Sequence, residues 1–198
     1  MRETTTTLLL EALHDPANEP VWLEFDARYR PILTGFAGQL GLQPDDAAEA
    51  AQETLTQFVR DYRAGKYDRG KGRLSSWIVA IARNRVLDLL RARAKRREWR
   101  GDSAFAALPD EQQLSGIWDA EQERLVFAQA MAELREKTRT APATLRVFEL
   151  FALQGLPAEA VGRECGLSPA EVYRVKNRVT KRLREIVTRL HAMYAEDD

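Results

Sequence analysis

Hydrophobic residues recur every three or four positions through most of this chain, and polar residues fill the positions between them. This spacing is typical of amphipathic helices. The longest such pattern covers residues 74–100, where the hydrophobic positions are Leu74, Trp77, Ile78, Ile81, Ala82, Val86, Leu89 and Leu90. Because no glycine or proline interrupts it, the pattern predicts one long helix.

The N-terminal part of the chain contains two further helical patterns. The first runs from about 19 to 40 with an aromatic and aliphatic stripe, and Pro31 is expected to kink it or divide it in two. The second opens with Pro44 and two aspartates, which suit the positive end of a helix dipole, and it ends near Tyr62. Residues 1–18 give no firm signal and are expected to form an N-terminal arm, either flexible or with a short helix.

The part after the long helix divides into a linker and a second helical group. Residues 101–118 contain glycine, proline and polar residues without sustained periodicity, so we expect a linker there. A helical pattern follows, and Pro142 opens another helix that ends at Gly155. The predicted fold is therefore all-α, with two small helical domains, residues 19–100 and 119–198.

The last two predicted helices have the pattern of a helix-turn-helix. Residues 157–165 form a short first helix, and Gly166 permits a tight turn after it. Ser168 and Glu171 have the spacing of a capping box at the start of the second helix. The small Gly162 would let the two helices cross closely.

Polar and cationic residues dominate the outward face of that second helix, at Tyr173, Arg174, Lys176, Asn177, Arg178, Lys181 and Arg182. In a major groove, the N-terminal members of such a set reach base edges, and the later cations contact phosphates. A helical hairpin that only packs would not need so many outward cations. The pattern therefore favours contact with DNA.

The charges are segregated along the chain, although the 30 Lys and Arg balance the 30 Asp and Glu. The net charge is −7 over residues 1–62, +10 over 63–100, −4 over 101–141 and +1 over 142–198. A basic block between acidic blocks indicates two surfaces with different partners, a polyanion for one and a basic or polar protein surface for the other. The alternative is that the blocks pair with each other inside the molecule.

Several classes of function are disfavoured by composition. No stretch is long and apolar enough for a membrane span or a signal peptide, so we expect a cytoplasmic protein without membrane insertion. Cys165 is the one cysteine and His14 and His191 are the two histidines, which leaves too few ligands for a disulfide framework or a zinc site. We expect no metal, no cofactor and no small-molecule substrate.

A basic segment precedes the long helix and continues into its C-terminal half. Residues 63–73 hold three glycines, five cations and Tyr67, and an aromatic ring among cations suits a single-stranded base and its phosphates. Cations at a helix C-terminus also complement the helix dipole, which remains an alternative for the arginine run. The candidate DNA contacts are Lys66, Tyr67, Arg69, Lys71, Arg73, Arg83, Asn84, Arg91, Lys95, Arg96 and Arg97.

The helix that begins at Pro44 has a mostly acidic outward face. An ordinary solvated surface would also have this composition. The candidate residues for contact with a protein partner are Asp46, Glu49, Gln52, Glu53 and Gln57.

The order of these features resembles that of sigma factors of the sigma-70 superfamily, in the compact extracytoplasmic-function (ECF) group. In chain order they are Tyr29-Arg30-Pro31, the acidic segment from Asp46 to Glu53, Trp77-Ile78 with Ala82-Arg83-Asn84, the arginine-rich tail and the helix-turn-helix. The resemblance implies that residues 19–100 are sigma region 2, residues 101–118 a linker and residues 119–198 sigma region 4.

By this resemblance, the acidic helix docks on the clamp-helix coiled coil of the largest subunit of core RNA polymerase. The family run Asp-Ala-Glu-Asp-Leu-Val-Gln-Glu stands here as Asp-Ala-Ala-Glu-Ala-Ala-Gln-Glu over residues 46–53, so Ala48 lacks a carboxylate. The resemblance also implies promoter DNA as a partner. The basic segment and the long helix would bind the minus-ten element, with a flipped base captured by the loop. The minus-thirty-five element would contact Ser168, Ala170, Tyr173, Arg174, Lys176, Asn177, Arg178 and Lys181.

Other functions remain as alternatives. A helix-turn-helix regulator that acts without polymerase would share the C-terminal motif, although the all-helical N-terminal half does not resemble an effector domain. An enzyme would need a metal or a phosphate-binding glycine loop, and neither is evident. A module that only binds protein would not need the recognition-helix cations. One departure from the family is Glu164, at a position where the family usually has an apolar residue. An anti-sigma factor is left open as a further partner.

Overall fold

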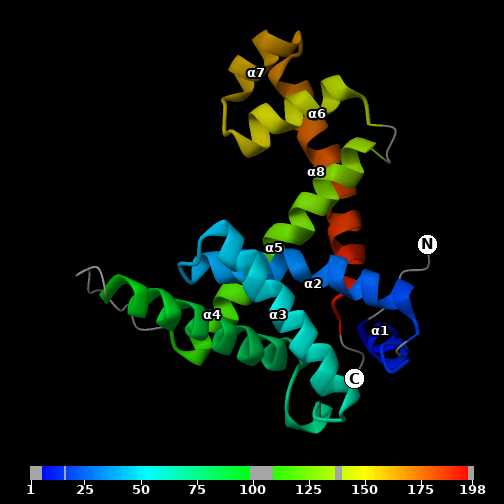
Figure 1. The fold of residues 1–198 in the computed structure, drawn as a ribbon. Coiled ribbons are helices and arrows are strands. Elements are labelled where there is room, and N and C mark those ends of the chain that lie inside the picture. Colours follow the sequence, from blue (N-terminus) through cyan, green and yellow to red (C-terminus); the bar gives the residue numbers. More distant parts are fainter. Residues whose placement is uncertain (1–5, 16, 99–108, 137–139, 196–198) are drawn as a thin grey trace. The chain divides into compact units, whose positions relative to one another are not determined.

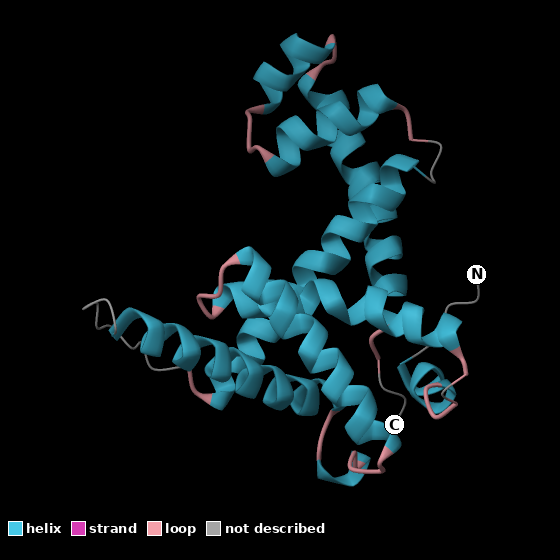
Figure 2. Cartoon of the chain, viewed as in Figure 1, coloured by secondary structure: helices cyan, strands magenta, loops and turns pink. Residues whose placement is uncertain are grey.

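The structure, a computed structural model, describes residues 6–15, 17–98, 109–136 and 140–195, without the side chains of 94–98. The chain divides into two compact units. The first unit comprises residues 1–125 with 195–198, and the second unit comprises residues 126–194. In the described part of the chain the regular elements are helices, which short loops connect (Figure 2). None of the described helices is long and apolar enough to cross a membrane.

Three long helices form the centre of the first unit (Figure 1). These are α2 (Glu19–Gln39), α3 (Pro44–Arg63) and α4 (Leu74–Glu98). Their hydrophobic stripes meet in a core in which α3 packs against both α2 and α4. The largest core side chains of these helices are Phe25, Ile32, Leu33, Phe36, Leu55, Phe58, Leu74 and Ile78.

Pro31 does not divide α2, which is helical on both sides of it. The flanking Tyr29 and Ile32 are buried in the core. Their packing holds the chain in helical geometry although the proline removes one backbone donor. The hydroxyl of Thr34 also donates to the backbone carbonyl of Arg30 at 2.9 Å, within the turn that follows the proline.

The N-terminal arm contains a short helix, α1 (Thr6–Ala12), one of the two possibilities that the sequence left open. It belongs to the hydrophobic core, because Leu9 and Leu13 are 0% and 1% exposed. The hydroxyl groups of Thr6 and Tyr29 lie 3.4 Å apart. The arm therefore packs on the first unit.

Part of the predicted linker is helical, because α5 (Glu111–Glu136) begins inside it. Asp110 and Gln113 cap its first turn reciprocally: the Gln113 N–H donates to Oδ1 of Asp110 at 2.8 Å, and the Asp110 N–H donates to Oε1 of Gln113 at 3.1 Å. The ring of Trp118, 1% exposed, lies against Tyr29 and Phe36 of α2 with centroid distances of 6.4 and 6.3 Å. The division between the two units falls within α5, after residue 125.

The second unit contains the rest of α5 and four further elements. These are α6 (Pro142–Phe148), the π-helical turn η2 (Glu149–Leu153), α7 (Ala158–Cys165) and α8 (Pro169–Ala192). One hydrophobic cluster joins α5, α6 and α8, and a smaller one joins α6, η2, α7 and α8. The larger cluster includes Val126, Met131, Leu134, Phe148, Val179, Leu183 and Ile186.

The helix-turn-helix predicted from the sequence is formed by α7 and α8. Gly166 has a φ of +69°, the left-handed conformation that favours glycine. A methyl group on Gly162 would collide with the backbone carbonyl of Leu167 in the turn. The capping box of Ser168 and Glu171 is present. The predicted roles of both glycines and of the cap are therefore confirmed.

Candidate functional site

The acidic residues predicted on α3 are in part at its surface. Glu49, Gln52 and Glu53 are exposed and are called the acidic face below. Ala48 is also exposed. The alanine that replaces a family carboxylate thus removes a surface charge and leaves the packing of α3 unchanged.

The two other predicted polymerase contacts on α3 have partners within the chain. Asp46 is half-buried, and its carboxylate forms an ion pair with the guanidinium group of Arg93 in α4. Gln57 donates from Nε2 to Oδ2 of Asp61 at 2.8 Å. At Asp46 and Arg93, then, the acidic and basic blocks do pair inside the molecule, which was the alternative to two external partners.

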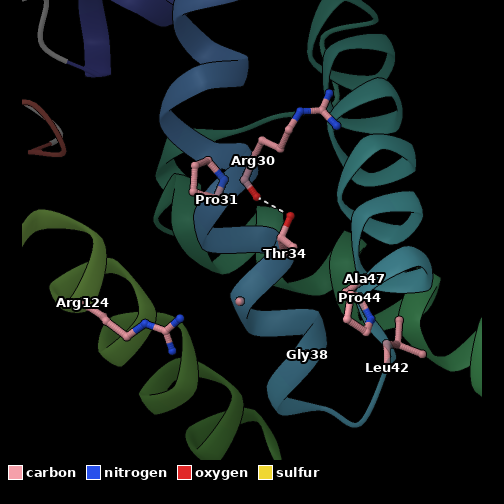
Figure 3. Close-up of a pocket in the computed structure, with 9 residues that line it drawn as sticks. Arg30, Pro31, Thr34, Gly38, Leu42, Pro44, Ala47 and Arg124 are labelled. Atoms are coloured by element: carbon pink, nitrogen blue, oxygen red, sulfur yellow. Dashed lines mark hydrogen bonds between the residues drawn. The ribbon is translucent and has the colours of Figure 1, made fainter. Parts of the chain in front are cut away.

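A groove of about 510 Å³ lies beside the start of α3 (Figure 3). Arg30 at its edge is bound to Asp26 by two hydrogen bonds, from Nε at 2.9 Å and from a terminal nitrogen at 2.5 Å, and these raise the pKa of its guanidinium group. Arg30, the charged residue that α2 contributes to the groove, is thus already paired within α2. The remaining lining is mostly small or apolar and includes Pro31, Thr34, Gly35, Gly38, Leu42, Pro44, Ala47 and, from α5, Arg124.

The loop of residues 64–73, called the basic loop below, is held by contacts near its ends. Gly65 has a φ of +70°, which lets the chain turn directly after α3. Nζ of Lys66 lies 2.7 Å from Oδ1 of Asp61, and Nζ of Lys71 lies 3.2 Å from Oδ2 of Asp68. Hydrogen bonds from these lysines lower the pKa of each aspartate. The cations exposed on the loop are Lys66, Arg69, Lys71 and Arg73.

Tyr67, the predicted base-stacking residue, belongs to an aromatic cluster. Its ring stacks on Trp77 of α4 at 5.2 Å and lies 6.1 Å from the ring of Tyr62. Trp77 in turn contacts Phe58 of the core at 5.1 Å. Because Tyr67 is half-buried, part of its ring remains open to a base while the rest fixes the loop to the core.

Some of the predicted contacts on α4 are accessible. Asn84 is exposed and Arg83 is half-buried, and both line a groove of about 1010 Å³ that residues 109–118 border on its other side. Arg91 is exposed and lies 3.7 Å from Asp88. The side chains of three further predicted contacts lie outside the described residues, namely Lys95, Arg96 and Arg97.

The N-terminal half of α8 presents the predicted recognition residues at the surface. Tyr173 is 53% exposed, and the ring of Phe151 in η2 meets it edge to face at 5.1 Å. Phe151 thus holds a residue predicted to contact DNA. Lys176 is half-buried, and the exposed members of the set are Ser168, Ala170, Arg174, Asn177, Arg178 and Lys181.

Two residues of this motif have a structural use. The hydroxyl of Ser168 accepts from the N–H of Glu171 at 3.3 Å and lies 2.8 Å from Oε2 of Glu171, so it is engaged in the cap. Glu164, the departure from the family pattern, is exposed and pairs with Arg146 at 3.0 Å. The substitution therefore adds a surface ion pair and does not disturb the packing of α7.

Comparison with known proteins shows what this chain is similar to. Residues 25–96 match the family Sigma-70 region 2. The chain is also 27% identical over 136 residues to the ECF RNA polymerase sigma factor RpoE of Cereibacter sphaeroides, an alignment that covers 69% of this chain and 72% of the relative. Residues 25–96 are therefore similar to sigma-70 region 2, and the chain is similar to an ECF sigma factor.

The segment that matches Sigma-70 region 2 extends from α2 into α4. It includes the acidic face, the basic loop and the groove-lining Arg83 and Asn84. The helix-turn-helix lies outside the matched residues.

Sequence reasoning missed several residues that hold these surfaces in place. Arg93, Phe151 and His14 contact residues 22 to 48 positions distant in the chain, in the pairs with Asp46, Tyr173 and Tyr62. Helical periodicity reports which face a residue occupies but not which distant residue it meets. No local pattern in the sequence identifies these pairs.

Proposed function

We propose that this sigma factor binds core RNA polymerase through the acidic face and directs it to promoters with two DNA-binding surfaces. The observation that carries the proposal is that one three-helix unit presents two surfaces of opposite charge. The acidic face is exposed on α3, and the cations of the basic loop are exposed directly after the same helix. A protein partner and a nucleic acid can thus be bound together.

In this proposal, the basic loop and α4 bind the minus-ten element and stabilise its melted strand. An unstacked base contacts the open part of the Tyr67 ring, and Lys66, Arg69 and Lys71 contact the neighbouring phosphates. Stacking on an aromatic ring returns about 1 to 3 kcal/mol per base, which is comparable with the few kcal/mol that unstacking costs. No bond is made or broken in this process.

The second unit contacts the minus-thirty-five element through α8. Tyr173, Arg174 and Asn177 are exposed near its N-terminus, where a recognition helix meets base edges. Arg178 and Lys181 follow further along, where phosphate contacts are expected. The edge-to-face contact with Phe151 supports this role because it limits the positions of the Tyr173 ring.

The direct test is run-off transcription from a library of promoter sequences with purified bacterial core polymerase, with and without the protein. We expect transcripts that depend on the protein and share a two-block upstream motif. Absence of added transcripts, together with absence of co-elution with core polymerase, would contradict the proposal for the polymerase used.

Charge-reversal variants test the docking surface. Glu53→Lys should weaken binding to core polymerase about tenfold or more, because the acidic face would meet its partner with a like charge. Glu136→Lys is the matched control, since this exposed carboxylate at the end of α5 lies outside the predicted surfaces. Equal affinities of the two variants would contradict docking through the acidic face.

A regulator that acts without polymerase is the second candidate, and the exposed cations of α8 are the observation that favours it. The two functions predict different DNA binding. A sigma factor should bind its promoter motif only together with core polymerase, whereas the regulator should bind it alone with comparable affinity at physiological salt.

A further inference from the structure

The N-terminal arm touches the last turn of α3, directly before the basic loop begins. The backbone carbonyl of Leu13 accepts a hydrogen bond from Nε of Arg63 at 3.1 Å. The rings of His14 and Tyr62 lie 4.6 Å apart with an interplanar angle of 34°. Arg63 is the last residue of α3 and Tyr62 precedes it, so both contacts act on the residues that anchor the loop.

A chain of aromatic contacts extends from the arm to the residue predicted to stack on a base. Tyr62, which His14 contacts, lies 6.1 Å from the ring of Tyr67, and Tyr67 stacks on Trp77 at 5.2 Å. Tyr62 is 8% exposed. Because Tyr62 is nearly buried beside Tyr67, the position of its ring restricts where the Tyr67 ring can lie.

The arm itself is fixed to the first unit and does not depend on the loop for its position. Leu9 and Leu13 are buried in the core, and Thr6 lies within hydrogen-bond distance of Tyr29. A fixed arm can therefore hold the start of a loop whose own glycines would otherwise leave it many conformations.

We propose that His14 is a positioning residue for the basic loop. Through it, the arm sets how strongly the protein discriminates among the four bases at the minus-ten position whose unstacked base contacts Tyr67. The inference rests on the proposed function of the loop. His14 contacts no DNA in this proposal. It acts by restricting the Tyr62 ring, and through it the orientation in which Tyr67 meets a base.

The test uses the full-length protein with core polymerase and a promoter library in which the most strongly selected minus-ten position carries each of the four bases. His14→Ala removes the ring contact, and His14→Phe keeps an aromatic ring at the same place. Leu8→Ala is the matched control, because Leu8 lies in the same arm and is 54% exposed. The readout is the ratio of transcripts from the best and the other bases, together with amide hydrogen exchange over residues 64–73.

We expect His14→Ala to lower this ratio about threefold to tenfold, since part of the stacking preference for one base is lost. Hydrogen exchange in the loop should become faster, while His14→Phe and Leu8→Ala should keep the wild-type ratio. An equal reduction of all transcripts by His14→Ala with an unchanged ratio would overturn the inference, as would a loss that His14→Phe does not restore. If wild type itself gave no protein-dependent transcripts, the proposed function would be at fault and not the arm.

Discussion

Gly162 lies where α7 passes over the turn of the helix-turn-helix. An added methyl group would collide with the carbonyl oxygen of Leu167, which is a backbone atom and cannot rotate away as a side chain does. Gly162 is a buried residue of α7 on the side that faces the turn. A single hydrogen atom in place of a methyl group thus permits the close approach of the two helices.

Gly162→Ala should therefore destabilise the second unit by about 1 to 3 kcal/mol, the usual range for overpacking. Thermal unfolding of the full chain, followed by far-UV circular dichroism, measures the change. Gly116→Ala is the matched control, because Gly116 is an exposed residue of α5 with nothing within 4 Å of an added methyl group. That substitution should stabilise by about 0.5 to 1 kcal/mol. Equal melting temperatures for wild type and Gly162→Ala would contradict the collision.

Glu171 makes the start of α8 sensitive to acid. Its carboxylate accepts from the backbone N–H of Ser168 at 2.8 Å and lies 2.8 Å from the Ser168 hydroxyl, and these hydrogen bonds lower its pKa below the usual 4.5. A pKa that is lower in the folded state adds stability above 4.5, and this stability is lost as the pH falls through the folded-state pKa.

Glu171→Gln keeps an acceptor in the capping box but removes the charge. Wild type should therefore be more stable than this variant at neutral pH, and the difference should shrink as the pH falls below 4.5. Parallel thermal melts of both proteins over a pH series measure it. A stability difference that stays constant with pH would show that the charge of Glu171 does not contribute.

The hydrophobic periodicity predicted the helices themselves better than the residues at which they begin and end. The first turns of α5 lie inside the predicted linker, because glycine, proline and polar residues there interrupt the helical pattern. Two signals were nevertheless present: the reciprocal cap of Asp110 and Gln113, and the spacing of Leu114 and Trp118, which are buried. The π-helical turn η2 has no comparable signal in the sequence.

The ion pair between Asp46 and Arg93 joins α3 to α4 and would compete with the predicted role of Asp46 in polymerase binding. Both side chains are partly buried, 25% and 29% exposed. Asp46→Asn and Arg93→Met should each destabilise the first unit by about 0.5 to 1 kcal/mol, and the double variant by less than the sum. Thermal unfolding of the four proteins in this double-mutant cycle measures the coupling.

Affinity for core polymerase then separates the two roles of Asp46. Because its carboxylate is already paired, we expect Asp46→Asn to weaken binding less than Glu53→Ala, which removes an exposed carboxylate. Measurement of both affinities at the same ionic strength decides the order. If Asp46→Asn were the more damaging variant, the pair with Arg93 would have to open when the sigma factor docks.

At the scale of the whole molecule, the sequence predicted which surfaces exist better than it predicted what holds them. The acidic face and the basic loop follow from charge and periodicity within single segments. The contacts of His14 with Tyr62 and of Asp46 with Arg93 join residues 48 and 47 positions apart. Such pairs depend on how helices pack, which a hydrophobic pattern restricts but does not determine.

The segregation of charge also predicts how DNA binding depends on salt. The chain has no net charge, so the proposed attraction to DNA would come from local groups of cations and not from the molecule as a whole. Replacing Lys66, Arg69 and Lys71 with glutamine removes three exposed cations of the basic loop. If each contacts one phosphate of a single strand, the slope of log affinity against log salt should fall by about 2.

The matched control replaces Arg60, Arg124 and Arg184 with glutamine, three exposed cations outside the predicted DNA surfaces. Both triple variants have a net charge of −3, because each loses three cations from a chain whose charges balance. The affinity of each holoenzyme for promoter DNA is measured over a salt series. Because the two variants have the same net charge, a difference in slope reflects where the cations were removed. Local phosphate contacts predict a lower slope for the loop variant alone. Equal slopes for the two variants would mean that the overall field, and not the basic loop, attracts the DNA.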